Sequence, residues 1–310
     1  MFLTITPNLA LDRTLVVPGF ETGGVSRAVQ VSPVAGGKGI NVARALGTLG
    51  AKALCMGFIG GHTGRWVSEL AEREGLACAW TPIDGETRTC ISIVNPDVGG
   101  ETTQINEPGP ATTPGDWAHL TKDALGYTAE AQAICFCGSL PPASDPDAVR
   151  GCLSQLASET RLWVDTSGDA LRLAAEVQPY GIKVNQHEIG ALIGMDVPDA
   201  AAAFRAASML RERGIACVVV TLGAAGAIML SEQGRFHAEA PPIRALSTVG
   251  SGDSFLAGLV YGLAADEDHA AALGLAAAVG AANALTLGAG RFDRSTADRL
   301  RAVARVTTTV

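Results

Sequence analysis

The chain has 310 residues, of which 47% are hydrophobic and 17% are charged. This size and composition allow one large α/β domain with a substantial core and exclude a disordered or fibrous protein. The chain has 31 acidic and 23 basic residues, and the resulting net charge of −8 argues against a nucleic-acid partner. An anionic ligand would therefore need local basic residues.

Cysteine usage and hydropathy suggest the compartment. Seven cysteines lie scattered in apolar runs, without a Cys-x-x-Cys pair or a zinc-like spacing to histidine, so free thiols in a reducing cytoplasm are expected. Segment 1–7 lacks the basic flank and the length of a signal peptide and predicts a first strand. The uncharged segment 270–290 is long enough to cross a bilayer. Because it is mostly Ala and Gly, we expect a tightly packed helix pair and no membrane association.

Two hairpins are expected before regular βα alternation begins. Their strands are 14–17 with 25–31, and 89–94 with 101–105 through the connection 95–100. Between the hairpins, 53–59 predicts a strand and 65–74 a helix. Hairpins that interrupt βα units could pair with each other. We therefore predict a single domain, 1–310, with a small β-sheet lid inserted at about 12–34 and 87–107.

From residue 117 onwards, strands alternate regularly with helices. The expected strands are 133–137, 161–165, 182–184 and 216–221. This order predicts a doubly wound, mostly parallel sheet flanked by helices, in which ligands bind beyond the carboxyl ends of the strands. Residues at those ends, which could face one crevice, are Gly138, Ser139, Asp165, Asn185, Glu188 and Gly223.

The glycine-rich segment 36–41, Gly-Gly-Lys-Gly-Ile-Asn, leads into an amphipathic helix. It is not a P-loop, because Gly39 stands where that motif needs Ser or Thr, and the chain contains no Gly-x-Gly-x-x-Gly fingerprint. A ligand-binding turn and a tight turn that only serves packing both remain open on this pattern.

The stretch 247–255, Ser-Thr-Val-Gly-Ser-Gly-Asp-Ser-Phe, predicts a glycine turn that opens a helix near Ser251. Such a turn is an anion site, because its free amides and the helix dipole face the ligand. Asp253 is then either a favourable dipole partner or a base that accepts a proton from an attacking hydroxyl. This stretch alone does not decide between the two.

Two further turns have a structural and a functional interpretation each. Asn185 and Glu188 form an N-cap and its N3 partner, and the same oxygen donors suit hydrated magnesium. Segment 221–226 is a hairpin-like turn by itself, and its glycines would also allow a nucleotide ring to approach. Arg27, Lys38 and Arg88 are solvated charges by default, but they could hold a substrate phosphate.

Four stretches in a fixed order resemble the PfkB, ribokinase-like carbohydrate kinases across essentially the whole chain. They are Asp12 after the first strand and the segments 36–41, 183–188 and 249–253. Segments 87–91 and 138–142 look most like the phosphosugar branch, that of tagatose-6-phosphate kinase and 1-phosphofructokinase. One departure is Lys-Val-Asn at 183–185, where the family usually has Lys-Pro-Asn; it removes a backbone restraint but no ligand.

The resemblance implies a ribokinase-like fold and ATP-dependent phosphorylation of a ketohexose phosphate to the bisphosphate, the acceptor being fructose 1-phosphate, tagatose 6-phosphate or fructose 6-phosphate. It implies that Asp253 takes the hydroxyl proton, while the amides of Gly250, Ser251 and Gly252 stabilise the transferred phosphoryl group. Implied substrate-binding residues are Asp12, Arg27, Gly37, Lys38, Asn41, Arg88 and Ser139. Implied nucleotide-binding residues are Lys183, Asn185, Thr221, Gly223, Gly226 and Asn283. Asn185 and Glu188 would hold Mg²⁺ through water.

The same resemblance implies a homodimer through the lid, with Arg27 reaching a neighbouring site, and leaves room for a monovalent cation. Two alternatives remain open: a kinase for an unphosphorylated sugar or nucleoside, and a silent regulator that binds sugar phosphate or nucleotide. Lys38 and Arg88 argue against the first, because a neutral substrate would not offset the desolvation of two cations. Asp253 argues against the second, because pure binding would be better served by Asn.

Overall fold

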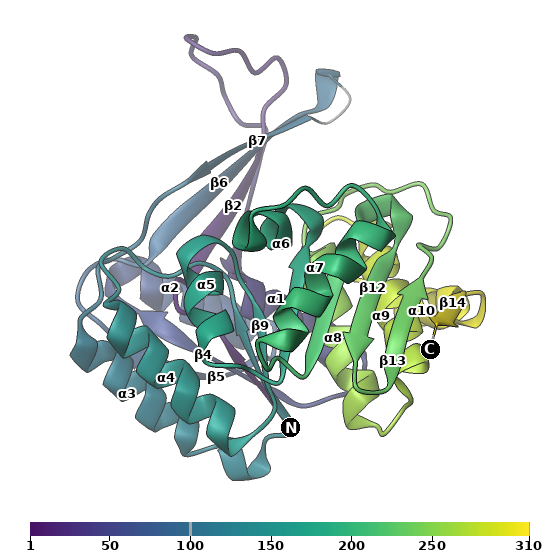
Figure 1. Ribbon diagram of the computed structural model, residues 1–310. Helices are drawn as coiled ribbons and strands as arrows, with labels where there is room; N and C mark the ends of the chain where they lie inside the picture. The colour runs from purple at the N-terminus through teal and green to yellow at the C-terminus, as the bar shows by residue number, and fades with distance from the viewer. Residues whose placement is uncertain (99–100, 310) are drawn as a thin grey trace.

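The computed structural model describes residues 1–98 and 101–309 and shows a large twisted sheet from which a smaller sheet projects (Figure 1). The large sheet has ten strands in the order β14-β13-β12-β11-β10-β9-β8-β1-β4-β5. Its strands are β1 (Phe2–Ile5), β4 (Ala53–Ile59), β5 (Ala77–Pro82), β8 (Ala133–Cys137), β9 (Leu162–Asp165), β10 (Gly181–Asn185), β11 (Cys217–Thr221), β12 (Ala227–Ser231), β13 (Gly234–Ala238) and β14 (Val306–Thr309).

Pairing within this sheet is parallel from β11 to β5 and antiparallel from β11 to β14. The prediction of a doubly wound, mostly parallel α/β sheet is therefore confirmed. The helices are α1 (Lys38–Thr48), α2 (Gly61–Arg73), α3 (Pro114–Leu125), α4 (Pro146–Glu159), α5 (Gly168–Glu176), α6 (Gln186–Ile193), α7 (Ala200–Glu212), α8 (Ser251–Ala264), α9 (His269–Ala284) and α10 (Arg294–Ala302).

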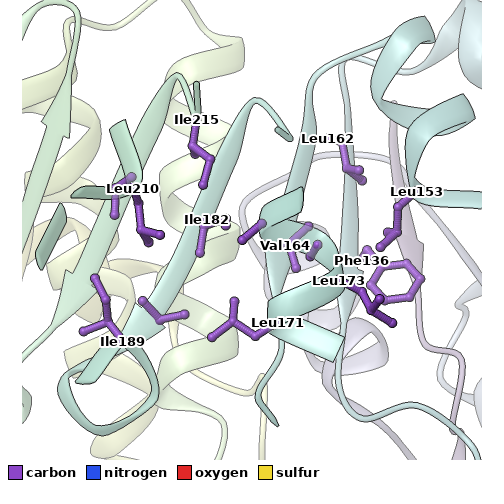
Figure 2. Packing of buried hydrophobic residues seen from close by; sticks show 14 of the residues in the cluster. Phe136, Leu153, Leu162, Val164, Leu171, Leu173, Ile182, Ile189, Leu210 and Ile215 are labelled. Carbon is purple, nitrogen blue, oxygen red and sulfur yellow. The ribbon is translucent and has the colours of Figure 1, made fainter. Parts of the chain in front are cut away.

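Two hydrophobic layers cover the sheet because alternate residues of a strand point to opposite faces. On β9, Leu162 and Val164 join the layer under α3 to α7, whereas Trp163 joins the layer under α1 and α8 to α10. Figure 2 shows the first of these layers, in which Phe136 and Leu153 lie close to one another. Burial on both faces fixes the strand register, and thus fixes where the carboxyl ends of the strands lie.

The small sheet is the predicted lid, and its order is β3-β2-β6-β7. Its strands are β2 (Ala10–Val16), β3 (Gln30–Gly36), β6 (Arg88–Asn95) and β7 (Glu101–Asn106). Each hairpin is antiparallel, and a parallel pair of β2 with β6 joins the hairpins, as expected. The connection predicted at 95–100 includes residues 99 and 100, which lie outside the described residues.

Three predicted elements differ from the structure. The first hairpin uses 10–16 and 30–36 rather than 14–17 and 25–31, because Val25 and Val29 are 90% and 71% exposed and their alternation has nothing to pack against. Helix α2 begins at Gly61 rather than residue 65. The segment 270–290 contains one helix, α9, and its packing partner is α8 rather than a second helix of the segment. Over the residues the structure describes, no helix has the length and apolarity that a membrane span needs.

Candidate active site

The N-terminal turns of α1 and α8 meet beside the carboxyl ends of the central strands. Asn41 Nδ2 donates a hydrogen bond of 2.8 Å to Asp253 Oδ2. Gly250 begins the α8 turn with a φ of 77°, and a Cβ there would lie 2.5 Å from the Cα of Ala289, so only glycine fits. Within the described residues, no side chain caps this helix, and its first-turn amides keep their attraction for an anion.

Asp253 is a buried carboxyl, only 6% exposed. Burial, with help from nearby Asp165, raises the pKa of Asp253 to about 6, although Lys38, Lys183 and the bond from Asn41 act in the opposite direction. A carboxyl with this pKa is ionised at neutral pH and still binds a proton readily. These are the properties of a general base.

Two ammonium groups share the single carboxylate of Asp165. Lys38 Nζ lies 3.0 Å from Asp165 Oδ1, and Lys183 Nζ lies 2.6 Å from Asp165 Oδ2. Burial opposes ionisation of Asp165, but both lysines outweigh it and hold its pKa below the usual value. The charge of Asp165 in turn raises the pKa of Lys38. Two ammonium groups thus lie side by side at this carboxylate, and such groups can bind a phosphoryl group.

Lys183 also reaches the first turn of α8. A Cβ on Gly252 would lie 2.9 Å from Lys183 Nζ, so the glycine makes room for the ammonium group. The prediction of three free turn amides needs a correction, because the N–H of Ser251 donates to Thr248 O at 3.2 Å. The remaining first-turn amides and Lys183 are therefore the groups at this turn that could attract an anion.

Asp12 lies on the lid strand β2, where it pairs with Val34 of β3, two residues before Gly36. A Cβ on Gly36 would lie 2.3 Å from Asp12 Cγ, so glycine is required where this carboxyl folds over the strand. Burial raises the pKa of Asp12 to about 6, against the charges of Arg44 and Arg88, and Asp253 raises it further. Asp12 thus lies within electrostatic reach of Asp253. Gly37, whose φ is 131°, follows β3 and occupies the N-cap position of α1.

Asn8 connects two of the predicted phosphate-binding residues at the base of the lid. Arg88 donates to Asn8 O from Nε and Nη2, at 3.3 and 3.0 Å. The Asn8 amide donates to Ser139 Oγ at 3.3 Å, which brings Ser139 and Arg88 to the same place. Arg88 Nη1 also donates to Glu107 O at 3.3 Å, so its guanidinium is held in position before any ligand binds.

Asn185 and Glu188 form a complete capping box at the start of α6. Asn185 Oδ1 accepts from the N–H groups of His187 and Glu188, both at 2.9 Å, and Glu188 Oε2 accepts from the Asn185 N–H at 2.8 Å. The structural interpretation is therefore confirmed. The charge of Glu188 also helps raise the pKa of Lys38, so this carboxylate lies near the lysine cluster. The described part of the chain holds no group of three or more His, Cys, Asp or Glu side chains suited to a metal.

The residues predicted to bind the nucleotide do not form one cluster as the residues around Asp253 do. Asn283 is buried, and its amide bonds to Val249 O and Ser254 Oγ, at 2.9 and 3.0 Å. Asn283 thus lies behind the α8 turn, so in this structure it positions the turn instead of offering a ligand contact. A Cβ on Gly226 would lie 2.0 Å from Ala238 O, so strand packing already requires this glycine.

Thr221 and Gly223 lie at the carboxyl end of β11. Thr221 Oγ1 donates to Val184 O at 3.4 Å, and Gly223 has a φ of 59° with open space where a side chain would begin. Arg27 is exposed in the connection between β2 and β3, and that connection forms the end of the lid farthest from the large sheet (Figure 1). The structure therefore does not bring Arg27 to the other predicted residues of its own chain.

Sequence reasoning placed Asp165 at a strand end without a role, and it missed Asn8, Arg44 and Glu74 entirely. Asn8 and Glu74 act through contacts with residues far away in the chain, for which the sequence carries no signal. Arg44 had a weak signal, because it follows Asn41 by three residues and so shares its helix face.

Comparisons with known proteins agree with this geometry. The family model described as pfkB family carbohydrate kinase matches residues 8–296. The 1-phosphofructokinase of Escherichia coli K12 is 35% identical over 292 residues, covering 94% of this chain and 93% of that protein. The 1-phosphofructokinase of Vibrio cholerae is 32% identical over 300 residues, covering 96% and 94%.

Among solved structures, phosphofructokinase-2 from Escherichia coli in complex with potassium superposes with a TM-score of 0.90 at 26% identity, covering 97% of this chain and 98% of that one. The agreement extends over both the large sheet and the lid, since nearly the whole of each chain is covered. The residues gathered around Asp253 therefore stand in a chain that belongs to the pfkB family of carbohydrate kinases, enzymes that transfer a phosphoryl group to a hydroxyl.

Proposed function

We propose that this chain transfers the γ-phosphoryl group of ATP to a hydroxyl of a ketohexose phosphate, and that fructose 1-phosphate is its acceptor. The observation that supports this best is the cluster of Asp253, Lys38, Lys183 and Asp165 at the uncapped turn of α8. The relatives named 1-phosphofructokinase favour fructose 1-phosphate over tagatose 6-phosphate and fructose 6-phosphate.

In the proposed reaction, ionised Asp253 accepts the proton of the attacking hydroxyl. The bond from Asn41 occupies Oδ2, so we assign the substrate proton to Oδ1. A bond forms between the sugar oxygen and the γ-phosphorus while the bond from that phosphorus to the ADP oxygen breaks. Lys38, Lys183 and the amides of the α8 turn stabilise the charge on the transferred group.

The acceptor is held between the lid and the N-terminus of α1. Asp12 and Asn41 offer a carboxylate and the second N–H of an amide to sugar hydroxyls, and Gly37 allows close approach. Arg88, Ser139 and Lys38 are the proposed ligands of the substrate phosphate. Arg27 is proposed to contribute from a neighbouring subunit, because it belongs to the connection between β2 and β3, which forms the end of the lid farthest from the large sheet.

The nucleotide is proposed to lie along Thr221, Gly223 and Gly226, with its phosphates toward Lys183. Glu188 fits hydrated Mg²⁺, because the capping bond engages only its Oε2 and leaves Oε1 for a metal-bound water. Asn185 Oδ1 already accepts two backbone hydrogen bonds, so Asn185 is proposed to serve the Mg²⁺ site by holding Glu188 in place. When bound, Mg²⁺ would neutralise charge on the phosphates. A monovalent cation is proposed from the potassium complex of phosphofructokinase-2, and we assign no residues of this chain to it.

Dimerisation through the lid is proposed from its surface. The lid and its connections expose large apolar side chains, namely Val25, Val29, Val31 and Ile105. An apolar surface of this kind on a projecting sheet favours contact with a second copy. A cytoplasmic location is proposed from the seven cysteines, all of which are free.

The proposal is tested by ADP release with Mg-ATP and a panel of acceptors: fructose 1-phosphate, tagatose 6-phosphate, fructose 6-phosphate, fructose, ribose and adenosine. We expect turnover with a sugar phosphate, fastest with fructose 1-phosphate, and only background rates with Asp253→Asn. Turnover confined to fructose, ribose or adenosine would contradict the role given to Arg88 and Lys38. No turnover with any acceptor would favour a silent binding protein.

A further inference from the structure

Arg44 lies behind the proposed base, one side chain removed from it. Its side chain is only 7% exposed, and its guanidinium is bonded to protein atoms on several sides. Nη1 donates to Asn41 Oδ1 at 2.8 Å, and Nη2 donates to Ala35 O. Nε and Nη2 donate to the two carboxylate oxygens of Glu74, at 2.6 and 3.0 Å. An arginine buried and bonded in this way cannot itself contact the substrate.

Glu74 holds this guanidinium from the end of α2. It accepts two parallel bonds from Arg44, which fix the plane of the guanidinium and direct Nη1 at Asn41. Glu74 Oε2 also lies 3.0 Å from Arg291 Nη2, and the backbone N–H of Arg291 donates to Asn283 Oδ1 at 3.1 Å. Because Asn283 bonds to the α8 turn, Glu74 is connected through Arg44 to Asn41 on α1 and through Arg291 and Asn283 to the turn of α8.

We propose that Arg44, held by Glu74, is a positioning residue that keeps the amide of Asn41 turned so that it donates a hydrogen bond to Asp253. The proposal rests on the proposed function, in which Asp253 accepts the substrate proton. Arginine carries only donors, so only the carbonyl oxygen of the amide can face it, and the NH₂ group must then face the carboxylate. With the amide reversed, Oδ1 would face Asp253 and would stabilise the protonated acid, which cannot act as a base.

Several charged groups face Asp253, and they define what a change at Arg44 can alter. They are Asp12 from β2, Lys38 from α1, Asp165 from β9 and Lys183 from β10. The hydrogen bond from Asn41 lowers the pKa of Asp253, and the charge of Arg44 lowers the pKa of Asp12. Loss of Arg44 is therefore expected to make both carboxyls harder to ionise.

The test compares Arg44→Met with the parent enzyme, using fructose 1-phosphate and Mg-ATP, in the presence and absence of Asn41→Ala. We expect Arg44→Met to move the acid limb of the kcat profile upward by about one pH unit, while KM for Mg-ATP stays within about twofold. In the Asn41→Ala background most of this shift should disappear, because the amide through which Arg44 acts is gone. Arg44→Lys keeps a positive charge but loses the paired N–H groups of the guanidinium, so it should shift the acid limb by less than Arg44→Met does.

A loss of kcat by the same factor at every pH, or an equal shift with and without Asn41, would overturn the proposal. Arg301 lies on the distant helix α10 and pairs with Glu267, so Arg301→Met is the control for a general loss of stability and should leave the profile unchanged. If Arg44→Met does not fold, Glu74→Gln provides the second variant. It should shift the limb in the same direction, and an unshifted limb would equally contradict the proposal.

A readout without turnover separates this inference from the proposed function. The protein is labelled with ¹³C at the aspartate carboxyls, and Asp253→Asn identifies the Asp253 signal during a pH titration by NMR. We expect Arg44→Met to raise the midpoint of that signal even if no sugar phosphate is a substrate. An unchanged midpoint would reject the role of Arg44 while leaving the kinase proposal intact. A shifted midpoint in a protein without turnover would support the role of Arg44 and reject the kinase proposal.

Discussion

At Asp253, burial and the charge of Asp165 raise the pKa while two lysines and the Asn41 amide lower it, and this balance is expected to set the pH range of the proposed reaction. Burial raises the pKa to about 6, and two lysines and one amide prevent a larger rise. Below that value the carboxyl is protonated and cannot accept the substrate proton. We expect kcat/KM for the sugar phosphate to fall about tenfold per pH unit below pH 6. Steady-state rates between pH 5 and 8 measure this, and a flat profile would contradict the assignment.

The raised pKa of Asp253 also means that its ionised form lowers the free energy of unfolding. Because the pKa of Asp253 is raised from 3.8 to about 6, the folded state binds more protons than the unfolded chain between these values. The contribution of this carboxyl to the free energy of unfolding therefore falls as the pH rises through that window, and it stays low above it. We expect Asp253→Asn to be more stable than the parent at pH 8, by at most about 3 kcal/mol, and nearly equal at pH 3.5.

Urea unfolding at the two pH values measures this difference. Asp169→Asn, a change at an exposed carboxyl paired with Arg172, is the matched control and should show almost no dependence on pH. A variant that is destabilised equally at both pH values would show that Asp253 stabilises the fold through its bonds and that burial is not the dominant effect.

Asp165, unlike Asp253, is expected to stabilise the fold when ionised, because it pairs with the buried Lys183 and the half-buried Lys38. Replacing it by Asn would leave Lys183 buried without a counter-charge, which costs about 3–5 kcal/mol when one partner of a buried pair is removed. We expect a correspondingly lower urea midpoint for Asp165→Asn. Asp147→Asn removes one of the two acidic partners of Arg150, whose pair with Glu176 remains, and should cost less than about 1 kcal/mol. Equal costs at both positions would contradict the arrangement.

At the scale of elements, close packing of α8 against α9 holds the N-terminal turn of α8, which carries Asp253, in place. A Cβ on Gly258 would lie 3.0 Å from Ala276 Cα, and one on Gly262 would lie 3.0 Å from Ala272 Cα. We expect Gly258→Ala to cost about 1–3 kcal/mol through overpacking. Gly151→Ala on α4 has open space and should stabilise by up to about 1 kcal/mol, because alanine favours the helix. Differential scanning calorimetry measures the stability of both variants. A stabilised Gly258→Ala would show that α8 and α9 are not tightly packed.

Elements were predictable from sequence where local pattern and burial agree. The apolar run 133–137 is buried on both faces and forms β8 with the expected bounds. Alternation at 25–31 was misleading, because its valines are exposed and the strand begins at Gln30. The pattern records which residues could be buried on one face, but not whether another element is present to cover that face.

The site was predictable to a similar extent. Motif segments located Asp253, Lys38 and Asn185 because each follows a turn that the sequence marks with glycine or a cap. The bond of Asn41 to Asp253 joins residues 212 positions apart, and only the fold brings them together. For the same reason the bond of Arg44 to Glu74 could not be foreseen, because Arg44 lies on α1 and Glu74 follows the end of α2.

At the scale of the whole molecule, the lid exposes several large apolar side chains on a projecting sheet. Val29 and Ile105 are 71% and 54% exposed, so we expect a homodimer in solution and dissociation to monomers on Val29→Asp or Ile105→Asp. Sedimentation velocity at several concentrations measures this. Val303→Asp, at an exposed apolar residue after α10, should leave the assembly unchanged. A parent protein that sediments as a monomer throughout would reject the lid interface.

The most direct test of the account is to observe the product of the proposed reaction. ³¹P NMR of the enzyme with Mg-ATP and fructose 1-phosphate should show ADP and a second sugar phosphate ester appearing together. With Asp253→Asn, Mg-ATP should still bind in calorimetry, but no second ester should form. A bisphosphate formed at the parent rate by Asp253→Asn would contradict the proposed base. The absence of any bisphosphate with the parent enzyme would contradict the assignment of a sugar-phosphate kinase acting on fructose 1-phosphate.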